Sequence, residues 1–187
     1  MKKISTLYKK DPNDLGRVVD EVNPNNEWAL TNGVPTRKYD GTACAIIGGE
    51  LYKRYDCKIN IKTGEYKKPI PKGAIPCQEA DLKSGHHPHW VRCDKNNPAD
   101  KWHFDAFKKN LPDGTYELIG EKVQGNPEKI KGHHLVKHGS DILNITNLSF
   151  EALKKYLSEA DIEGIVFHEK GGERMCKIRK SDFGLHR

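Results

Sequence analysis

The chain has 187 residues, of which 35% are hydrophobic and 31% charged, and it carries a formal net charge of +6. This length predicts one domain with a core large enough to fold without disulfides, and the composition excludes a disordered chain. The longest apolar run is Ala43–Ile47 and no apolar stretch follows the first lysines, so we expect neither a membrane nor a secreted protein.

The charge balance and the cysteines indicate a partner and a compartment. A surplus of basic side chains favours a polyanionic partner such as nucleic acid, although many domains carry such a charge for solubility alone. The five cysteines are odd in number and widely spaced, and no Cys-x-x-Cys pair occurs. This usage argues against a disulfide framework and predicts a reducing, cytoplasmic or intracellular location.

The first half of the chain predicts strands followed by a long loop. Residues 1–26 are polar and interrupted by prolines. A strand is expected over Arg37–Ile47 and a second over Glu50–Cys57, joined as a hairpin by Gly48-Gly49. The segment Lys58–Pro98 is rich in Pro, Gly, Lys and His, and connections of this length are usually functional or mobile.

The second half predicts a mixture of helices and strands. Helices are expected over Ala99–Asn110 and from the capping residue Ser149 to Ala160, and strands over Thr115–Val123, Glu163–His168 and Arg174–Lys180. Strands outnumber helices, and most of them are joined by turns. The pattern therefore predicts an α+β fold with mainly antiparallel sheet.

One segment, His86–Cys93, invites a metal-binding interpretation because it combines three histidines with a cysteine. Zinc sites, however, usually bring together two spaced pairs of ligands. Pro88 interrupts this cluster, and no second pair stands at a suitable distance. The spacing argues against structural zinc and favours a loop that meets substrate or lies in solvent.

Four short segments place charged side chains on or beside the expected strands. They are Lys38-Tyr39-Asp40-Gly41, Tyr116–Glu121, Glu163–Phe167 and Lys177–Lys180. In this order they supply a lysine beside an aspartate, then carboxylates, then a cluster of cations. Such a set is suited to a nucleoside triphosphate that is handled together with a metal ion.

The physical case begins with the lysine. Its pKa must fall by about three units before it is a nucleophile at neutral pH, and desolvation and nearby cations supply such a shift. Carboxylates can bind ribose hydroxyls or hydrated Mg²⁺, and cations can neutralise charge on a reacting phosphate. The Gly-x-x-x-x-Gly-Lys loop that binds phosphate in other enzymes is absent.

The ordered set resembles the covalent nucleotidyltransferase superfamily of ATP-dependent ligases and mRNA capping enzymes. Within it, Tyr116–Gly120, Gln124–Pro127 and Lys177–Gly184 are most similar to a group of small single-domain RNA ligases. The resemblance covers Thr36–Gly184. It implies a nucleotidyltransferase (ATP-grasp-like) domain of mainly antiparallel β-sheets flanked by a few helices. This single catalytic domain would span residues 1–187, with no C-terminal oligonucleotide-binding domain.

The resemblance also implies a reaction. A lysine attacks the α-phosphate of ATP and releases pyrophosphate, AMP passes to a 5′-phosphate of RNA, and a 3′-hydroxyl displaces it. Mg²⁺ or Mn²⁺ would assist, and we expect a monomer. The alternatives are another covalent nucleotidyltransferase, such as a DNA ligase or a capping guanylyltransferase, and a non-catalytic RNA-binding module. The lack of a C-terminal barrel in the sequence argues against the first, and the complete charged set argues against the second.

By position, the resemblance implies a role for each charged residue. Lys38 would be the nucleophile and Asp40 would orient it, Arg54 would contact the ribose or the incoming phosphate end, and Glu163 would hold the metal through water. The other expected nucleotide-binding residues are Glu117 or Glu121 for the ribose, and Lys177 and Arg179 for the α-phosphate. Further candidates for contacts with adenine or RNA are His138, Trp90 and Lys180.

Overall fold

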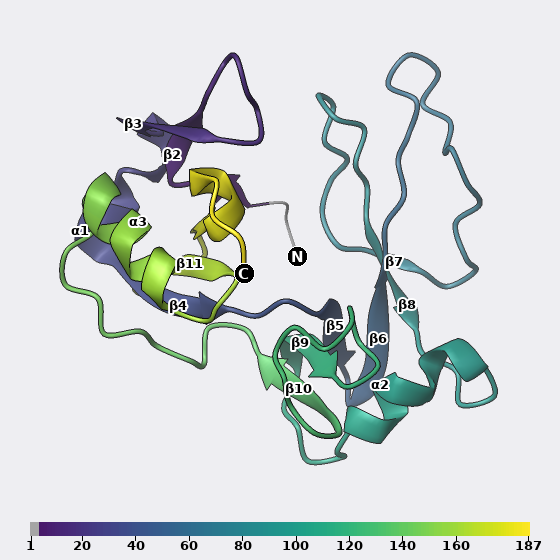
Figure 1. Ribbon diagram of the computed structural model, residues 1–187. Coiled ribbons are helices and arrows are strands. Elements are labelled where there is room, and N and C mark those ends of the chain that lie inside the picture. Colours follow the sequence, from purple (N-terminus) through teal and green to yellow (C-terminus); the bar gives the residue numbers. More distant parts are fainter. Residues whose placement is uncertain (1–3) are drawn as a thin grey trace. The chain divides into compact units, whose positions relative to one another are not determined.

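Figure 1 shows the computed structural model, which describes residues 4–187. The chain forms two compact units. The terminal unit combines residues 4–40 with Gly139–Arg187, and the central unit comprises Gly41–His138. Within the described residues no helix has the length and apolar character needed to cross a membrane.

The terminal unit is built on a four-stranded sheet of order β1-β12-β11-β4. Its strands are β1 (Ser5–Thr6), β4 (Gly33–Lys38), β11 (Gly164–Glu169) and β12 (Met175–Arg179). Only β1 and β12 pair in parallel. The unit also contains the pair β2 (Tyr8–Lys10) and β3 (Val18–Val22), the helices α1 (Trp28–Asn32) and α3 (Phe150–Glu159), and the 3-10 helices η1 (Pro24–Asn26) and η3 (Lys180–Phe183).

One face of the terminal sheet is apolar and forms the core. Ile165, Phe167 and Ile178 are fully buried there and pack with the apolar residues of α1 and α3. The helix α3 begins where the sequence predicts, because the Ser149 side chain accepts a hydrogen bond from the Ala152 N–H at 3.4 Å. Burial of this face stabilises the sheet. Because successive side chains of a strand point to opposite faces, the residues next to these buried ones lie on the other face.

The opposite face of the same sheet carries charged side chains. Gly164 pairs in register with Lys38 on one side and with Arg179 on the other, and Val166 pairs with Lys177. Residues directly opposite each other in an antiparallel pair lie on the same face. The register therefore gathers Lys38, Lys177 and Arg179 on one surface of the sheet.

The central unit is built on a six-stranded antiparallel sheet of order β10-β9-β5-β6-β8-β7. The strands are β5 (Thr42–Ile47), β6 (Glu50–Tyr55), β7 (Ile75–Pro76), β8 (His89–Arg92), β9 (Gly114–Gly120) and β10 (His133–Lys137). A 3-10 helix, η2 (Pro98–Asp100), leads into α2 (Lys101–Ala106). Ala106 of α2 packs with Cys44, Ile46 and Leu118 of the sheet.

The α+β class and the mainly antiparallel pairing agree with the sequence prediction. The predicted strand Arg37–Ile47, however, is wrong as one element. It is two strands, β4 and β5, which belong to different units. The chain leaves the strand conformation before Gly41, where a Cβ atom would lie 2.2 Å from the Leu118 carbonyl oxygen. Only glycine allows so close an approach of the backbone to β9.

The predicted hairpin between β5 and β6 is confirmed. Gly48 and Gly49 adopt φ values of 58° and 76°, the left-handed conformation that a tight two-residue hairpin turn requires. The Asp113 carboxylate accepts hydrogen bonds from both of their N–H groups, at 2.6 and 3.0 Å. These two hydrogen bonds lower the pKa of Asp113.

Other predicted boundaries shift, and several elements were not foreseen. The helix expected over Ala99–Asn110 is shorter, because η2 occupies its first turn and α2 ends at Ala106. The long segment before it contains β7 and β8 instead of loop alone. The other elements absent from the sequence prediction are α1, β1, β2, β3, β10, η1 and η3.

Candidate functional site

Lys38 and Glu163 are brought together by the pairing of β4 with β11. Lys38 is the last residue of β4, and its register partner Gly164 directly follows Glu163. The Lys38 ammonium is ion-paired with the Glu163 carboxylate, and each side chain is 23% exposed. Lys38 Nζ also donates to the Tyr39 carbonyl oxygen at 3.4 Å. The predicted nucleophile thus has a carboxylate as its direct partner.

The surroundings of Glu163 favour its protonated form more than water does. Burial raises the pKa of this carboxyl, the Lys38 ammonium opposes that rise, and the nearby negative charge of Asp40 adds to it. Asp40, which was predicted to orient Lys38, is therefore close enough to Glu163 to influence it. The three predicted residues form one electrostatic group within the terminal unit.

Lys177 lies on the same face of the sheet as Lys38 and is partly buried. Burial lowers the pKa of its ammonium to about 8, and the positive charges of Arg179 and Lys38 contribute to this shift. Within residues 4–187 it forms no ion pair. A half-desolvated cation without a carboxylate partner is suited to bind an anion such as phosphate.

Arg179, in contrast, is held by a carboxylate that the sequence prediction did not use. Its Nη2 and Nε donate to Asp182 at 2.9 and 3.3 Å, and Lys10 Nζ reaches the same carboxylate at 2.7 Å. Burial alone would raise the pKa of Asp182, but the hydrogen bonds from Arg179 and Lys10 outweigh it and lower the pKa. The i, i+3 spacing of Arg179 and Asp182 was the signal available in the sequence.

In the central unit, Glu117 and His138 form a second pair of predicted residues. Glu117 Oε2 lies 2.9 Å from His138 Nε2, and both side chains are mostly buried. The other ring nitrogen of His138, Nδ1, is buried and has no hydrogen-bond partner in the described part of the chain. Glu117 is on β9, whereas His138 directly follows β10, the strand paired with β9. The two candidates for ribose and adenine contacts thus lie side by side.

The remaining candidates of the central unit are less closely associated. Arg54 lies on β6 and is paired with Asp56, its Nε 2.8 Å from Oδ1. Glu121 is exposed and follows β9, outside the pair formed by Glu117 and His138. The surroundings therefore favour Glu117 over Glu121 as the buried carboxylate.

Two of the predicted RNA contacts are buried. Trp90 pairs in register with Arg54 and is only 6% exposed, so its ring is packed inside the unit and is not open to a base. This burial contradicts the interpretation of Trp90 as a stacking platform. Lys180 is also buried, and its backbone N–H donates to the Glu163 carbonyl oxygen at 3.0 Å. Its backbone thereby links η3 to the strand that positions Glu163.

The predicted residues consequently fall into two sets. The terminal unit holds Lys38, Asp40, Glu163, Lys177, Arg179 and Lys180, and the central unit holds Arg54, Trp90, Glu117, Glu121 and His138. The first set provides a lysine, a carboxylate paired with it, and a nearby cation that forms no ion pair with the described residues. That combination is suited to nucleophilic attack by an amine on a phosphate.

Comparison with known families supplies independent information. Residues 107–187 match the family described as RNA ligase 1, so this part of the chain is similar to that family. The matched segment includes Glu117, Glu163 and Lys177, whereas Lys38 and Arg54 precede it. No curated protein matches the chain.

Proposed function

From the similarity of residues 107–187 to RNA ligase 1, we propose that the chain is an ATP-dependent RNA ligase. It joins 5′-phosphate and 3′-hydroxyl ends of RNA through a lysyl-AMP intermediate on Lys38. The observation that carries the proposal is the ion pair of Lys38 with Glu163, on a sheet whose same face presents Lys177. A module that only binds RNA does not need a lysine paired with a partly buried carboxylate beside a second cation.

In the first step the Nζ of Lys38 attacks the α-phosphorus of ATP. A phosphorus–nitrogen bond forms, the bond to the pyrophosphate oxygen breaks, and the ammonium gives up its protons to reach the phosphoramidate. Glu163 is in direct contact with this ammonium, and burial raises the pKa of its carboxyl. A carboxylate with a raised pKa is a better proton acceptor, so Glu163 is suited to take a proton from Lys38.

The cations of the terminal unit bind the phosphates. Lys177 supplies a positive charge that forms no ion pair within residues 4–187, and it stabilises the charge that develops on the α-phosphate. Arg179 is oriented by Asp182, which holds its guanidinium in a defined position. A guanidinium that is already held in position loses less side-chain entropy when it binds a phosphate.

Mg²⁺ fits the oxygen ligands of this group. It prefers carboxylate oxygens and water, and it is usually held by one or two carboxylates together with the substrate phosphates. Glu163, with Asp40 nearby, would hold the ion through water. The bound ion would neutralise negative charge on the phosphates of ATP.

Glu117 and His138 are the residues proposed to contact the nucleoside. Glu117 binds the ribose hydroxyls, and the neighbouring His138 orients its carboxylate or contacts the adenine. AMP is then transferred to the 5′-phosphate of an RNA end. Finally, the 3′-hydroxyl of a second end attacks that phosphate, which seals the strand and releases AMP. The basic surplus of the chain, +6, favours binding of this polyanionic substrate.

A sealing assay tests the proposal. A nicked RNA duplex with a 5′-phosphate is incubated with the protein, Mg²⁺ and either ATP or GTP, and the products are resolved on a denaturing gel. We expect sealing with ATP, none with a 5′-hydroxyl nick, and none with the Lys38→Ala variant. The control is Lys155→Ala, which removes an exposed lysine from α3 in the same unit. Activity with GTP alone, or sealing by Lys38→Ala, would overturn the proposal.

A further inference from the structure

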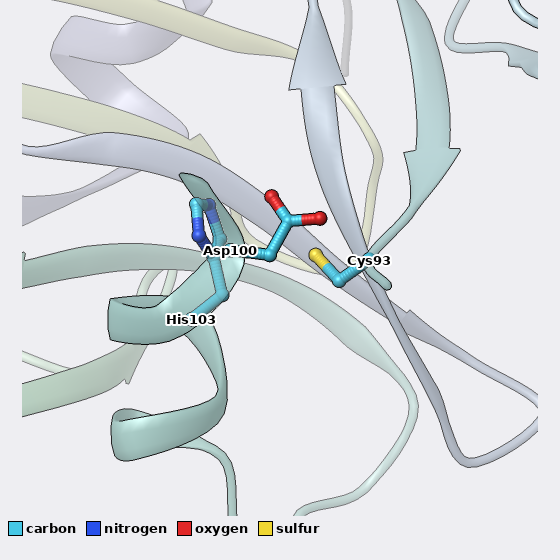
Figure 2. Close-up of side chains that lie close together, drawn as sticks. All are labelled: Cys93, Asp100 and His103. Carbon is cyan, nitrogen blue, oxygen red and sulfur yellow. The ribbon is translucent and has the colours of Figure 1, made fainter. Parts of the chain in front are cut away.

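A buried group in the central unit lies outside the residues used above. Cys93, Asp100 and His103 are all buried, and their ligand atoms lie within 4.8 Å of one another. Figure 2 shows the three side chains converging from the chain just after β8, from the end of η2 and from α2. The group combines a thiol, a carboxylate and an imidazole.

Local structure explains why these residues meet. Cys93 is fixed by its N–H, which donates to the Leu51 carbonyl oxygen at 2.9 Å. Asp100 Oδ2 accepts a hydrogen bond from the Asp94 N–H at 2.9 Å, which folds the intervening loop back onto η2. Asp100 and His103 are separated by one turn of helical chain, so their side chains lie on one side of it.

His103 gives the second, independent indication of a ligand. Its ring is only 9% exposed, and neither Nδ1 nor Nε2 has a hydrogen-bond partner within the described residues. A buried polar group without a hydrogen-bond partner destabilises the fold. In a neutral imidazole one ring nitrogen offers a lone pair. A metal ion would provide the partner that this nitrogen lacks.

The Asp100 carboxylate has lone pairs that could bind such an ion. It is 1% exposed and is ion-paired with Lys53, whose own side chain is 25% exposed. A carboxylate has about four lone-pair sites, and the contacts with Lys53 and Asp94 occupy two of them. The negative charges of a carboxylate and a thiolate would balance a divalent ion.

We propose that Cys93, Asp100 and His103 bind a Zn²⁺ ion that links the end of β8 to α2. Zn²⁺ accepts mixed sulfur, nitrogen and oxygen ligands, whereas Mg²⁺ and Ca²⁺ prefer oxygen alone. On binding, the ion displaces the thiol proton of Cys93, and water completes a fourth position. The site is separate from the Mg²⁺ ion of the ligase reaction and is independent of the proposed function.

The site also bears on the zinc interpretation considered for His86–Cys93. Only Cys93 of that segment takes part, and its partners lie downstream. The thiol of Cys57, not that of Cys93, lies 3.4 Å from the His89 ring. The alternative is that no metal binds here and that Asp100 is stabilised by its ion pair with Lys53 alone.

Metal titration distinguishes these two possibilities. The full chain is stripped with a chelator and titrated with Co²⁺, whose thiolate complexes absorb by charge transfer, and Zn²⁺ is then added as a competitor. We expect one equivalent to bind with a thiolate band that Zn²⁺ removes. Cys93→Ser and His103→Ala should each weaken binding by roughly 100-fold, because a ligand is lost. Cys57→Ser, which alters another buried cysteine of the same unit, should bind as the parent does.

The titration of the parent protein tests the proposal even if a variant fails to fold. Absence of a thiolate band in the parent would overturn the proposal, as would an unchanged affinity in folded Cys93→Ser. Neither ATP nor RNA is needed for the measurement. A negative result therefore leaves the ligase proposal untouched, and failure of sealing leaves the zinc site untouched.

Discussion

The ammonium of Lys38 forms an ion pair with the carboxylate of Glu163, which lies 125 residues further along the chain. The contact follows from strand register, because Gly164 pairs directly with Lys38. The carboxyl of Glu163, whose pKa is raised, thus contacts Lys38 Nζ, the atom that we propose attacks ATP. We therefore propose that Glu163 acts on the nucleophile, in addition to the role toward a metal ion that the resemblance implies.

Replacement of Glu163 by Gln tests this role. The amide keeps the shape but can neither accept the Lys38 proton nor bind Mg²⁺ through a charge. We expect lysyl-AMP formation to slow by about 100-fold or more, as is typical when a positioned acid–base group is lost. The rate is measured by single-turnover labelling with ATP. The control is Glu173→Gln, an exposed carboxylate of the same unit, and equal rates for the two variants would contradict the role of Glu163.

The lowered pKa of Lys177 predicts a pH dependence of ATP binding. A lysine with a pKa of about 8 is charged below that pH and loses its charge above it. Because only the charged form binds phosphate well, the dissociation constant for ATP should rise up to about tenfold per pH unit above pH 8.

Lys177→Arg supplies the matched control, since a guanidinium stays charged throughout this range. Its ATP affinity, measured by calorimetry from pH 7 to pH 10, should remain nearly constant. A parallel fall in both proteins would assign the pH dependence to another group.

The pair of Glu117 and His138 predicts which carboxylate serves the ribose. Glu117→Gln should weaken ATP binding by about tenfold, the cost of one hydrogen bond to a charged group. Glu121→Gln should bind ATP as the parent does, because this side chain is exposed beyond the end of β9. Equilibrium binding of ATP to the two variants decides between the alternatives. A loss confined to Glu121→Gln would reverse the assignment.

Gly164 has a packing role beside Lys38, the proposed nucleophile. A Cβ atom at this position would lie 2.4 Å from the Ile178 carbonyl oxygen and 2.8 Å from Arg179 Cα. Gly164→Ala should therefore lower the free energy of unfolding by roughly 1–3 kcal/mol, as overpacking does. In the hairpin turn, Gly171 has φ of +73° and open space around it. Gly171→Asn should be milder, because Asn tolerates this conformation. Urea unfolding compares the two, and equal losses would contradict the packing argument.

The sequence was enough to predict β11 and β12, which hold Lys177 and Arg179, but not the bounds of β4, which holds Lys38. The strands β11 and β12 have buried residues at every second position, and their register brings Lys38, Lys177 and Arg179 to one face. The ion pair with Glu163 could not be predicted, because it depends on which strand lies next to β4. Strand order is a property of the whole sheet and leaves no local signal.

The elements that the sequence did not predict also depend on contacts between residues that are distant in sequence. The strand β10, His133–Lys137, has few apolar residues, and its pairing with β9 stabilises it. The break between β4 and β5 depends on the contact of Gly41 with Leu118, which is distant in sequence. The approach of Cys93 to Asp100 and His103 likewise follows from the fold of a connecting loop and not from a ligand spacing in the sequence.

The most direct test of the account is to find where AMP is attached. The protein is incubated with Mg²⁺ and ATP without RNA, and its intact mass and proteolytic peptides are measured by mass spectrometry. We expect a single AMP adduct, carried by the peptide that contains Lys38 and absent from Lys38→Ala. An adduct on another lysine, or no adduct in a protein that seals RNA, would contradict the assignment of Lys38 as the nucleophile.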